Sequence, residues 1–350
     1  MKHFKLKFIF LFFGTVVLSN LVGCGEPDGN EPQPQAPIVF QIPNGFPTPV
    51  YDFNNNEVNR NRFELGRKLF YDPILSRDNS ISCGSCHQQA GAFSHIDHRV
   101  SHGIDNLNGT RNSPGLFNLA WHNSFFWDGG VNHIEVQPIS PIVNPVEMDE
   151  TLANVVNKLR ANNSYRNLFL EAYGSDSITS QMMLKALAQF MSLLVSADSK
   201  YDKYVRGESG GQLTTQELNG LNLFRQKCAT CHTEPLFTDL SFRNNGLDSV
   251  FQDDPGRALI TQSAADSGKF KVPSLRNISV TYPYMHDGSL NTLDKVLDHY
   301  INGVKPSTTL DPSLSGGISL TAQEKSDIIS FLRTLTDNKF LTNPEFADPN

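Results

Sequence analysis

Two short stretches decide the fold of this chain: Cys83-Gly84-Ser85-Cys86-His87 and Cys228-Ala229-Thr230-Cys231-His232. Cys-x-x-Cys-His is the attachment motif of c-type haem, in which two thiols bond the porphyrin and the adjacent histidine ligates the iron. A four-cysteine zinc site is one alternative, but its pairs usually lie within about 15–20 residues, whereas 145 positions separate Cys83 from Cys228. Disulfides or thioredoxin-like sites are another, and neither requires a histidine. We predict two haem c groups, with His87 and His232 as proximal ligands.

Length and composition indicate a globular protein. At 350 residues the chain is long enough for two domains of ordinary size. Its residues are 39% hydrophobic and 19% charged, which excludes a mainly disordered or fibrous protein. The net charge of −7 argues against binding to nucleic acid, because nucleic-acid-binding surfaces are normally basic.

Three further features recur in the same order in both halves of the chain. They are Gly66–Phe70 and Gly220–Phe224 ahead of the haem motifs, Pro114–Asn118 and Pro273–Asn277 as Pro-x-Leu-x-Asn, and the turns Trp127–Gly130 and His286–Ser289. One match would carry little weight, but the ordered set predicts a duplication. We place an N-terminal haem domain at 51–205 and a C-terminal one at 206–350, whose last residues can pack back on the first.

Helical patterns dominate the folded part, and alternating strand patterns are scarce. The expected helices cover residues 59–70, 151–172, 178–205, 215–227, 291–302 and 321–335. We therefore predict a mainly α fold of two cytochrome c-like domains with long loops, each domain holding one covalently bound haem.

The N-terminus predicts export. Residues 1–23 combine three lysines with an apolar run from Phe8 to Leu18, which is typical of a secretory signal and shorter than the about 20 apolar residues of a membrane-spanning helix. The end of this segment, from Leu21 to Cys24, resembles the lipobox of bacterial lipoproteins, which implies cleavage before Cys24 and lipid on its thiol. An ordinary cleaved signal with an idle cysteine is the alternative.

The mature chain is expected on the periplasmic side of a bacterial membrane, held there only by its lipid. Gly25 after Cys24 favours the outer membrane. Loss of residues 1–23 removes three lysines and no acid, so the net charge falls from −7 to −10, which suits a basic partner. The proline-rich residues 24–50 predict an extended tether between the anchor and the body.

Further motifs indicate a family. They are Arg111–Pro114, Phe126–Gly129, Gln137, Asn144–Met148 and Tyr284–Gly288. Together with the two haem motifs, this set resembles the bacterial dihaem cytochrome c peroxidases and their relative, the methylamine-utilisation enzyme that oxidises tryptophans to a quinone cofactor. The resemblance covers nearly all of 57–337. It implies that the N-terminal haem reacts with hydrogen peroxide and that the C-terminal haem accepts electrons from a small donor.

The resemblance also assigns roles around the N-terminal haem. Glu147 falls at the family's distal glutamate, which moves a proton between the peroxide oxygens, and Gln137 at a distal-pocket glutamine. Trp127 falls at the tryptophan between the haems, and Arg111 is expected to hold a haem propionate. Without the resemblance, Glu147 would be interpreted as a solvated loop acid, Trp127 as a core residue and Arg111 as an exposed surface residue.

Distal iron ligands are implied at both haems. In many family members a loop histidine caps the resting peroxidatic iron, and His102 lies in that loop, with His95 and His98 as rivals. The alternative is a pocket that is open from the start, as in the quinone-forming relative.

At the C-terminal haem, methionine-using peroxidases carry their ligand fourteen residues after the histidine of the His-x-Gly turn. Tyr300 stands there, fourteen residues after His286, and the quinone-forming relative uses tyrosine at this haem. An anionic oxygen ligand would lower the potential relative to a methionine thioether. The alternatives are His299 or Met285, with Tyr300 in the core.

A calcium ion between the domains is implied as well. Asn112 and the carbonyls of Thr281 and Pro283 match the family's protein ligands, and oxygen ligands suit a hard cation. By itself the stretch around Thr281 reads only as a turn.

Three functions are weighed. The first is a peroxidase that reduces hydrogen peroxide to water, with electrons from a basic monohaem cytochrome or a cupredoxin. The second is an oxidase that modifies a partner protein through high-valent haems, and the third is a dihaem electron-transfer protein without turnover. The family often dimerises, so a homodimer is an implied assembly.

Overall fold

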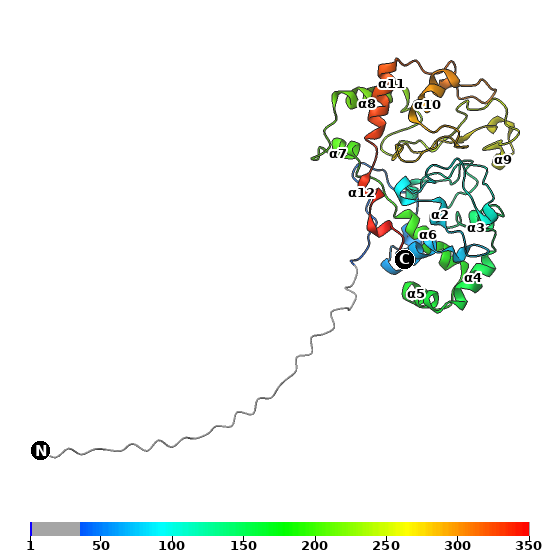
Figure 1. Ribbon diagram of the computed structural model, residues 1–350, viewed down its shortest axis with the longest axis vertical. Helices are drawn as coiled ribbons and strands as arrows, with labels where there is room; N and C mark the ends of the chain where they lie inside the picture. Colours follow the sequence, from blue (N-terminus) through cyan, green and yellow to red (C-terminus); the bar gives the residue numbers. More distant parts are fainter. Residues whose placement is uncertain (2–35, 350) are drawn as a thin grey trace. The chain divides into compact units, whose positions relative to one another are not determined.

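The structure is a computed structural model that describes Met1 and residues 36–349. Helices joined by long loops make up most of it (Figure 1), and the predicted mainly α class is confirmed. In the described part, one short antiparallel sheet pairs β1 (Phe242–Arg243) with β2 (Phe270–Lys271).

The remaining elements are helical. The α-helices are α1 (Arg60–Tyr71), α2 (Cys83–Cys86), α3 (Ile139–Val143), α4 (Leu152–Ala161), α5 (Asn163–Tyr173), α6 (Ser180–Ser192), α7 (Lys200–Arg206), α8 (Thr215–Lys227), α9 (Ala258–Thr261), α10 (Leu293–Asp298), α11 (Ala322–Arg333) and α12 (Asn338–Leu341). A π-helical segment, η7 (His299–Gly303), continues α10. Short 3-10 turns are η1 (Phe53–Asn55), η2 (Pro73–Leu75), η3 (Gln89–Gly91), η4 (Ile104–Asn106), η5 (Leu119–Trp121), η6 (Ala264–Asp266), η8 (Pro312–Leu314) and η9 (Pro344–Phe346).

Two expected helices are each divided in two. Asn162 ends α4, and its side-chain oxygen accepts from the N–H groups of Ser164 and Tyr165 to begin α5. Ser199 forms a capping box with Asp202 and begins α7 after an irregular stretch that follows α6. Both predictions of a single helix were wrong, because a capping side chain offers the backbone a new helix start that apolar periodicity does not reveal.

Residues 37–50, expected as part of the tether, pack on the body instead. The rings of Phe40 and Phe46 lie 5.5 and 5.2 Å from that of Trp121, and the Trp121 indole donates to the Pro47 carbonyl at 2.7 Å. Aromatic side chains between the prolines bury apolar surface there, so the compact body begins at Pro37. The predicted signal, the lipid site at Cys24 and residues 24–35 lie outside the described residues.

Two hydrophobic cores divide the body. The first is built mainly from residues 51–194, and the second lies within residues 201–335. In Figure 1 the first core lies among α2–α6, and the second among α8, α10 and α11. Phe340 and Phe346, near the C-terminus, belong to the first core. The end of the chain therefore leaves the second half and packs against the first.

The same helix crossing occurs in each core. A Cβ added to Gly66 on α1 would lie 2.0 Å from the Ala186 carbonyl oxygen on α6, and one added to Gly220 on α8 would lie 2.0 Å from that of Asp327 on α11. The helix axes can approach this closely only because glycine has no side chain at the contact. This explains why glycine opens both copies of the first repeated feature.

Three phenylalanines fill each crossing in the same way. They are Phe70, Phe93 and Phe190 in the first core and Phe224, Phe237 and Phe331 in the second, with ring centroids 5.1–6.2 Å apart in each set. Phe70 and Phe224 are the last residues of the glycine repeats. The packing therefore ties each repeated helix to the loop that follows its haem motif.

The asparagine of each Pro-x-Leu-x-Asn repeat clamps the chain that leaves the last helix of its core. The Ser196 N–H donates to Asn118 Oδ1 at 2.9 Å, and the Asp337 N–H donates to Asn277 Oδ1 at 2.8 Å. Both asparagines have left-handed φ, 56° and 57°, which asparagine tolerates better than most residues. The Asn277 amide also donates to the Ser196 hydroxyl at 3.0 Å, which joins the two clamps.

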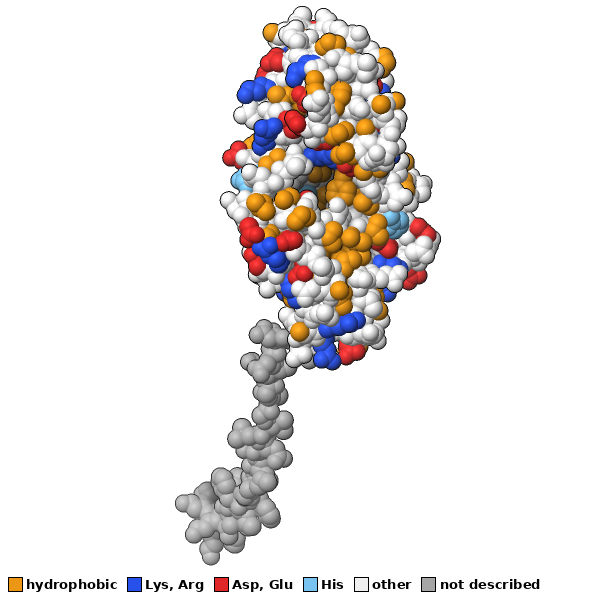
Figure 2. Space-filling model, turned by 90° about the vertical axis from the view of Figure 1, so that its right-hand side faces the viewer, with side chains coloured by type: hydrophobic (Ala, Val, Ile, Leu, Met, Phe, Trp, Pro, Cys, Tyr) orange, Lys and Arg blue, Asp and Glu red, His pale blue; other side chains and the backbone are white. Residues whose placement is uncertain are grey.

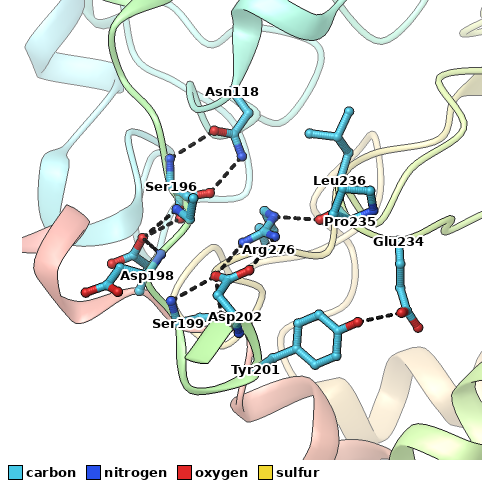
Figure 3. A network of polar contacts seen from close by, with 12 residues as sticks. Asn118, Ser196, Asp198, Ser199, Tyr201, Asp202, Glu234, Pro235, Leu236 and Arg276 are labelled. Atoms are coloured by element: carbon cyan, nitrogen blue, oxygen red, sulfur yellow. Dashed lines mark hydrogen bonds and ion pairs between the residues drawn. The ribbon is translucent and has the colours of Figure 1, made fainter. Parts of the chain in front are cut away.

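Arg276 sets the two repeats apart. It stands before Asn277, where the first half has Phe117, and its fully buried guanidinium donates to both Asp202 oxygens at 2.8 and 2.9 Å. Its Nε donates to the Pro235 carbonyl at 2.9 Å (Figure 3). The ion pair therefore holds α7 against the loop that follows the second haem motif.

Candidate active site

Helix α2 carries the first cysteine pair. The Ser82 hydroxyl caps this one-turn helix, which places Cys83 and Cys86 on neighbouring positions of one face. Burial raises the pKa of the Cys83 thiol to about 12, and it does the same for Cys228 in the second motif. The four described cysteines form no disulfide with one another.

Each motif histidine is oriented by a carbonyl in its own loop. Nδ1 of His87 lies 2.6 Å from the Phe93 oxygen, and Nδ1 of His232 lies 3.1 Å from the Phe237 oxygen. A carbonyl can only accept, so Nδ1 carries the hydrogen in both rings and Nε2 is left to bind a metal. Burial lowers the pKa of both histidines, which keeps them neutral.

The donor set fits haem c at both motifs. Each combines two partly buried thiols three positions apart with a neutral histidine whose outer nitrogen lacks a hydrogen, which is what covalent attachment and proximal ligation require. On the face of the molecule that Figure 2 shows, hydrophobic side chains gather around a hollow.

Glu147 lies in the turn after α3, close to the first cysteine pair. The approach depends on Gly103, because a Cβ there would lie 2.5 Å from the Glu147 Cα. The Asn144 amide donates to the Glu147 carboxylate at 2.8 Å. Burial raises the pKa of Glu147 more than this hydrogen bond lowers it. Burial raises the pKa of the Cys83 and Cys86 thiols, and the negative charge of the Glu147 carboxylate raises it further.

Gln137 occupies the turn that leads into α3. Its side chain is half-buried, and its carbonyl accepts from the Ser140 N–H at 3.3 Å. Helix α3 thus separates Gln137 from Glu147 by a short rigid segment. The assignment of both to a distal pocket stays a prediction.

The loop after the first motif brings three histidines together. The rings of His95 and His98 stack at 4.3 Å, and that of His102 lies 5.3 Å from His98 and 6.3 Å from His95. The His102 carbonyl lies 3.9 Å from the Cys86 sulfur. Among the described residues, buried Nδ1 atoms of His95 and His102 have no hydrogen-bond partner. His102, the predicted ligand, and its alternatives His95 and His98 therefore lie together beside the first haem motif.

Tyr300 belongs to the π-helical segment η7, a kind of segment that is frequent at functional sites. Burial raises its pKa to about 12, with smaller contributions from Cys228 and Cys231 and an opposing hydrogen bond from Asn245. Its hydroxyl is therefore buried near the second pair of thiols. His299 and Met285, the alternatives to it, both contact Asn245. The ligand assignment stays a prediction.

Trp127 lies between the two halves. Its indole N–H donates to the Asn112 carbonyl at 2.8 Å, and its own carbonyl accepts from the N–H of Lys271 on β2 at 2.7 Å. Lys271 places its ammonium 2.6 Å from the Ser124 carbonyl, and burial lowers its pKa to about 8. The tryptophan is thus fixed on one side by the first half and on the other by the second.

Arg111 also joins the halves. It donates two hydrogen bonds of 2.7 Å to Asp254 and one of 2.6 Å to Asp128. Burial raises the pKa of the Asp254 carboxyl, whereas its contact with the Arg111 guanidinium lowers it. The net shift of this pKa is downward. The predicted propionate contact stays a prediction, since the structure gives this guanidinium two carboxylate partners.

Asn112 meets the segment that carries the other implied calcium ligands. Its N–H donates to the His286 carbonyl at 2.8 Å. Thr281 and Pro283 lie a few residues earlier, where the Asp97 N–H approaches the Tyr282 carbonyl at 3.4 Å. The three residues are thus brought to one interface, and calcium binding stays a prediction.

The sequence analysis missed two arginines that dock the repeated turns. Arg257 donates to the carbonyls of Asp128 and Gly129 at 2.8 and 2.9 Å, and Arg99 donates to the carbonyl of Asp287 at 2.9 Å. Each half therefore holds the Asp-Gly turn of the other. The repeated turns were visible in the sequence, but nothing there pointed to the arginines.

Two further findings bear on the site and its surroundings. No helix in the described part of the chain has both the length and the apolar character needed to cross a bilayer. Within the same residues, no three His, Cys, Asp or Glu side chains are grouped as a metal site.

Known proteins are similar to this chain. A family model described as di-haem cytochrome c peroxidase matches residues 60–210. The chain is 35% identical to the methylamine utilization protein MauG of Methylorubrum extorquens, over 85% of this chain and 83% of that protein. It is 34% identical to the cytochrome c551 peroxidase of Nitrosomonas europaea, over 83% of each. The crystal structure of a MauG-like protein associated with microbial copper homeostasis is 33% identical and has a TM-score of 0.81, covering 89% of this chain and 99% of that one.

Proposed function

Because the chain belongs to the di-haem cytochrome c peroxidase family, we propose that it reduces hydrogen peroxide to water with electrons from a small redox protein. The electrons enter at the haem of His232 and pass to the haem of His87, where peroxide binds. The observation that carries this proposal is the difference between the two sites. Glu147 lies beside the first cysteine pair and Tyr300 beside the second.

Two protons and two electrons are consumed for each peroxide, and two waters are formed. Haem supplies an iron that binds a peroxide oxygen and exchanges electrons. Glu147 would take a proton from one peroxide oxygen and return it to the other, which leaves as water. Burial raises the pKa of this carboxyl, which brings it nearer to neutral pH and makes both steps accessible. Asn144 orients the carboxylate, and Gln137 is assigned to the same pocket.

Trp127 lies on the route between the halves. Its contacts with Asn112 and Lys271 fix its position there, so its indole can shorten the path of an electron between the two haems. Arg111 donates to Asp128, the residue after Trp127, and holds this segment; in the proposed function it would also bind a haem propionate. His102 would cap the first iron in the resting protein, and Asn112, Thr281 and Pro283 would hold a calcium ion that steadies the interface.

Oxidation of a partner protein is the second candidate. Tyr300 favours it, because an anionic oxygen ligand stabilises oxidised iron and tyrosine stands where methionine-using peroxidases have their ligand. The relatives include both MauG and a cytochrome c551 peroxidase. Steady-state consumption of peroxide with a reduced monohaem cytochrome or cupredoxin distinguishes the two, since the second function predicts a chemically modified partner protein in place of oxidised donor.

Glu147→Gln is the test of the catalytic assignment. It keeps the size and hydrogen-bonding capacity of the side chain and removes its proton transfer. General acid–base catalysis contributes about 10²–10⁴-fold, so the peroxide turnover should fall by that factor while both haems remain attached. Full activity of the variant would remove Glu147 from the mechanism.

The setting of the enzyme is part of the proposal. Export by residues 1–23 and a lipid on Cys24 would place it on the periplasmic side of a membrane, the outer one being favoured by Gly25. The net charge of −10 for the mature chain suits a basic donor. A homodimer is the assembly implied by the family.

A further inference from the structure

The turn that carries Trp127 is held by the second half along three consecutive backbone carbonyls. The Trp127 carbonyl accepts from the Lys271 N–H at 2.7 Å. The carbonyls of Asp128 and Gly129 accept from Nη1 of Arg257 at 2.8 and 2.9 Å. The position of this turn is therefore set by the half of the chain to which it does not belong.

Arg257 is itself fixed on the two-stranded sheet of the second half. Its N–H donates to the Lys269 carbonyl at 2.8 Å, just before β2 begins. Its guanidinium carbon lies 4.3 Å from the ring centroid of Phe242 on β1, a distance at which a cation and an aromatic face attract each other. Phe242 pairs with Lys271 in the sheet. The two donors to the turn are thus joined to each other through the same pair of strands.

Gly129 lets the turn lie directly against this surface. Its φ of 68° is left-handed, which glycine adopts at no steric cost. A Cβ at this position would lie 2.3 Å from the Phe242 ring and 2.7 Å from Nη1 of Arg257. The fit between the turn, the ring and the guanidinium therefore has no room for a side chain on Gly129.

The indole of Trp127 is held at its other end by a different segment. Its N–H donates to the Asn112 carbonyl at 2.8 Å, and the Asn112 N–H donates to the His286 carbonyl at 2.8 Å. A side chain is oriented most sharply when its backbone and its polar tip are both held. Release of the backbone by Arg257 should therefore be felt at the indole.

We propose that Arg257 is the positioning residue for Trp127: it fixes the indole between the two haem motifs and so sets the rate of electron transfer between them. The inference rests on the proposed function in taking Trp127 as part of the electron route. In this step one electron leaves the haem of His232 and one is gained at the haem of His87. Arg257 is neither oxidised nor reduced.

The position of the indole can be measured without turnover. The chain has two tryptophans, and the indole N–H of each donates to a backbone carbonyl, that of Trp121 at 2.7 Å and that of Trp127 at 2.8 Å. Nuclear magnetic resonance of isotope-labelled tryptophan in the protein with both haems follows hydrogen exchange at each indole. In Arg257→Met the exchange at Trp127 should accelerate about tenfold, because the hydrogen bonds that hold its turn are lost, while that at Trp121 stays unchanged.

Electron transfer is measured by mixing the fully reduced protein with one equivalent of hydrogen peroxide and following oxidation of the second haem by stopped-flow absorbance. R257M should slow this step by about tenfold or more, because a displacement of about 1 Å can cost a positioned reaction about 10²-fold. Trp127→Phe should slow it too. The double variant should be no slower than W127F, since Arg257 acts through the indole.

Two further variants keep the test decisive. Arg257→Lys retains a cationic donor with a shorter reach, so it should lie between the wild type and R257M in both measurements, and it replaces R257M if that variant does not fold with two haems. Arg206→Met is the matched control, because Arg206 on α7 is also half-buried and donates to a backbone carbonyl, that of Ala197, at 2.8 Å. It should change neither measurement.

Three results would overturn the proposal. One is wild-type exchange at Trp127 in R257M and R257K. Another is faster exchange shared by Trp121, or equally fast exchange in R206M, because the protein would then be loosened as a whole. The last is equal slowing of electron transfer by R257M in the wild-type and W127F backgrounds, because the arginine would then act by another route.

Failure of this inference and failure of the proposed route give different results. If W127F oxidises its second haem at the wild-type rate, Trp127 is not on the electron route, and the inference falls together with that part of the proposed function. If W127F is slow while R257M transfers electrons at the wild-type rate, the route stands and only the role of Arg257 is overturned.

Discussion

Replacing Arg276 with methionine removes one half of a buried ion pair and leaves the other half in place. Arg276 is fully buried and Asp202 is 5% exposed. In the variant, Asp202 keeps its hydrogen bonds from Ser199 but loses the guanidinium that donates to both of its oxygens. Removal of one partner from a buried pair costs about 3–5 kcal/mol, a large share of the about 5–15 kcal/mol by which folded proteins are stable.

Two comparisons test whether the cost comes from the stranded charge. Asp202→Asn in the R276M background removes that charge and keeps an oxygen for the Ser199 N–H, so the free energy of unfolding should recover most of the loss. Lys305→Met breaks an ion pair with Asp248 whose side chains are 53% and 49% exposed, and it should cost less than about 1 kcal/mol.

The pH dependence gives an independent check. Burial raises the pKa of Asp202, whereas the contacts with Arg276 and Ser199 together lower it by more, so the net shift of this pKa is downward. The stability from a lowered carboxyl pKa is present above the unfolded value of about 3.9 and is lost as the pH falls through the folded one. In R276M burial acts without the cation, the folded pKa rises, and protonation relieves the penalty. The deficit of R276M should therefore narrow as the pH falls from 7 toward about 4.

Urea unfolding of the haem-bearing protein, followed by far-ultraviolet circular dichroism at pH 7 and pH 5, measures these differences. The reasoning is refuted if R276M lies within about 1 kcal/mol of the wild type at pH 7 with an unchanged slope. It is equally refuted if the double variant is no more stable than R276M, because the stranded carboxylate would then not be the cause.

Four other predictions concern separate features. Gly220→Ala should lower stability by about 1–3 kcal/mol in urea unfolding, because the contact of 2.0 Å with the Asp327 oxygen outweighs the about 1 kcal/mol of helix propensity gained; an unchanged midpoint contradicts this. Burial raises the pKa of Glu147, so the acid limb of the pH profile of kcat/KM for peroxide should have an apparent pKa above the usual carboxyl value of about 4.3. This limb should vanish in Glu147→Gln. A limb that persists in the variant belongs to another group. Tyr300→Met should raise the potential of one haem, and an unchanged redox titration removes Tyr300 as ligand. Cys24→Ala should release the protein into the soluble fraction, and a soluble wild type contradicts the lipid anchor.

The sequence predicted the fold well where a physical constraint leaves a local pattern. Cys-x-x-Cys-His is such a pattern, and so is the glycine four positions before Phe70 and before Phe224, because a close helix crossing needs both residues on one helix. The Pro-x-Leu-x-Asn repeat was recognised as a repeat. That its asparagine clamps the chain after the last helix of each core could not be read from it, since the partners of Asn118 and Asn277 lie 78 and 60 positions away.

Prediction from the sequence failed where the contact that matters joins distant segments through residues that belong to no motif. Asn245 stands in an Asn-Asn-Gly stretch that is typical of a turn, and only the folded chain brings it to Met285 and His299. Lys271 likewise carries no motif. Family resemblance named Glu147 and Tyr300, but it could not supply the neighbours that change their chemistry.

The two halves share a scaffold and differ in the loops that it supports, which is what the proposed division of labour between the two haems requires. The glycine crossings, phenylalanine sets and asparagine clamps are built alike, so each half can hold its motif histidine at the same kind of carbonyl. The differences lie beyond that scaffold. The first half carries Glu147 and the histidine loop, and the second carries Tyr300 in η7. Because these segments contribute little to the repeated cores, their chemistry could diverge without loss of the fold, and the Asp-Gly turns docked by Arg99 and Arg257 keep the two sites in a fixed relation.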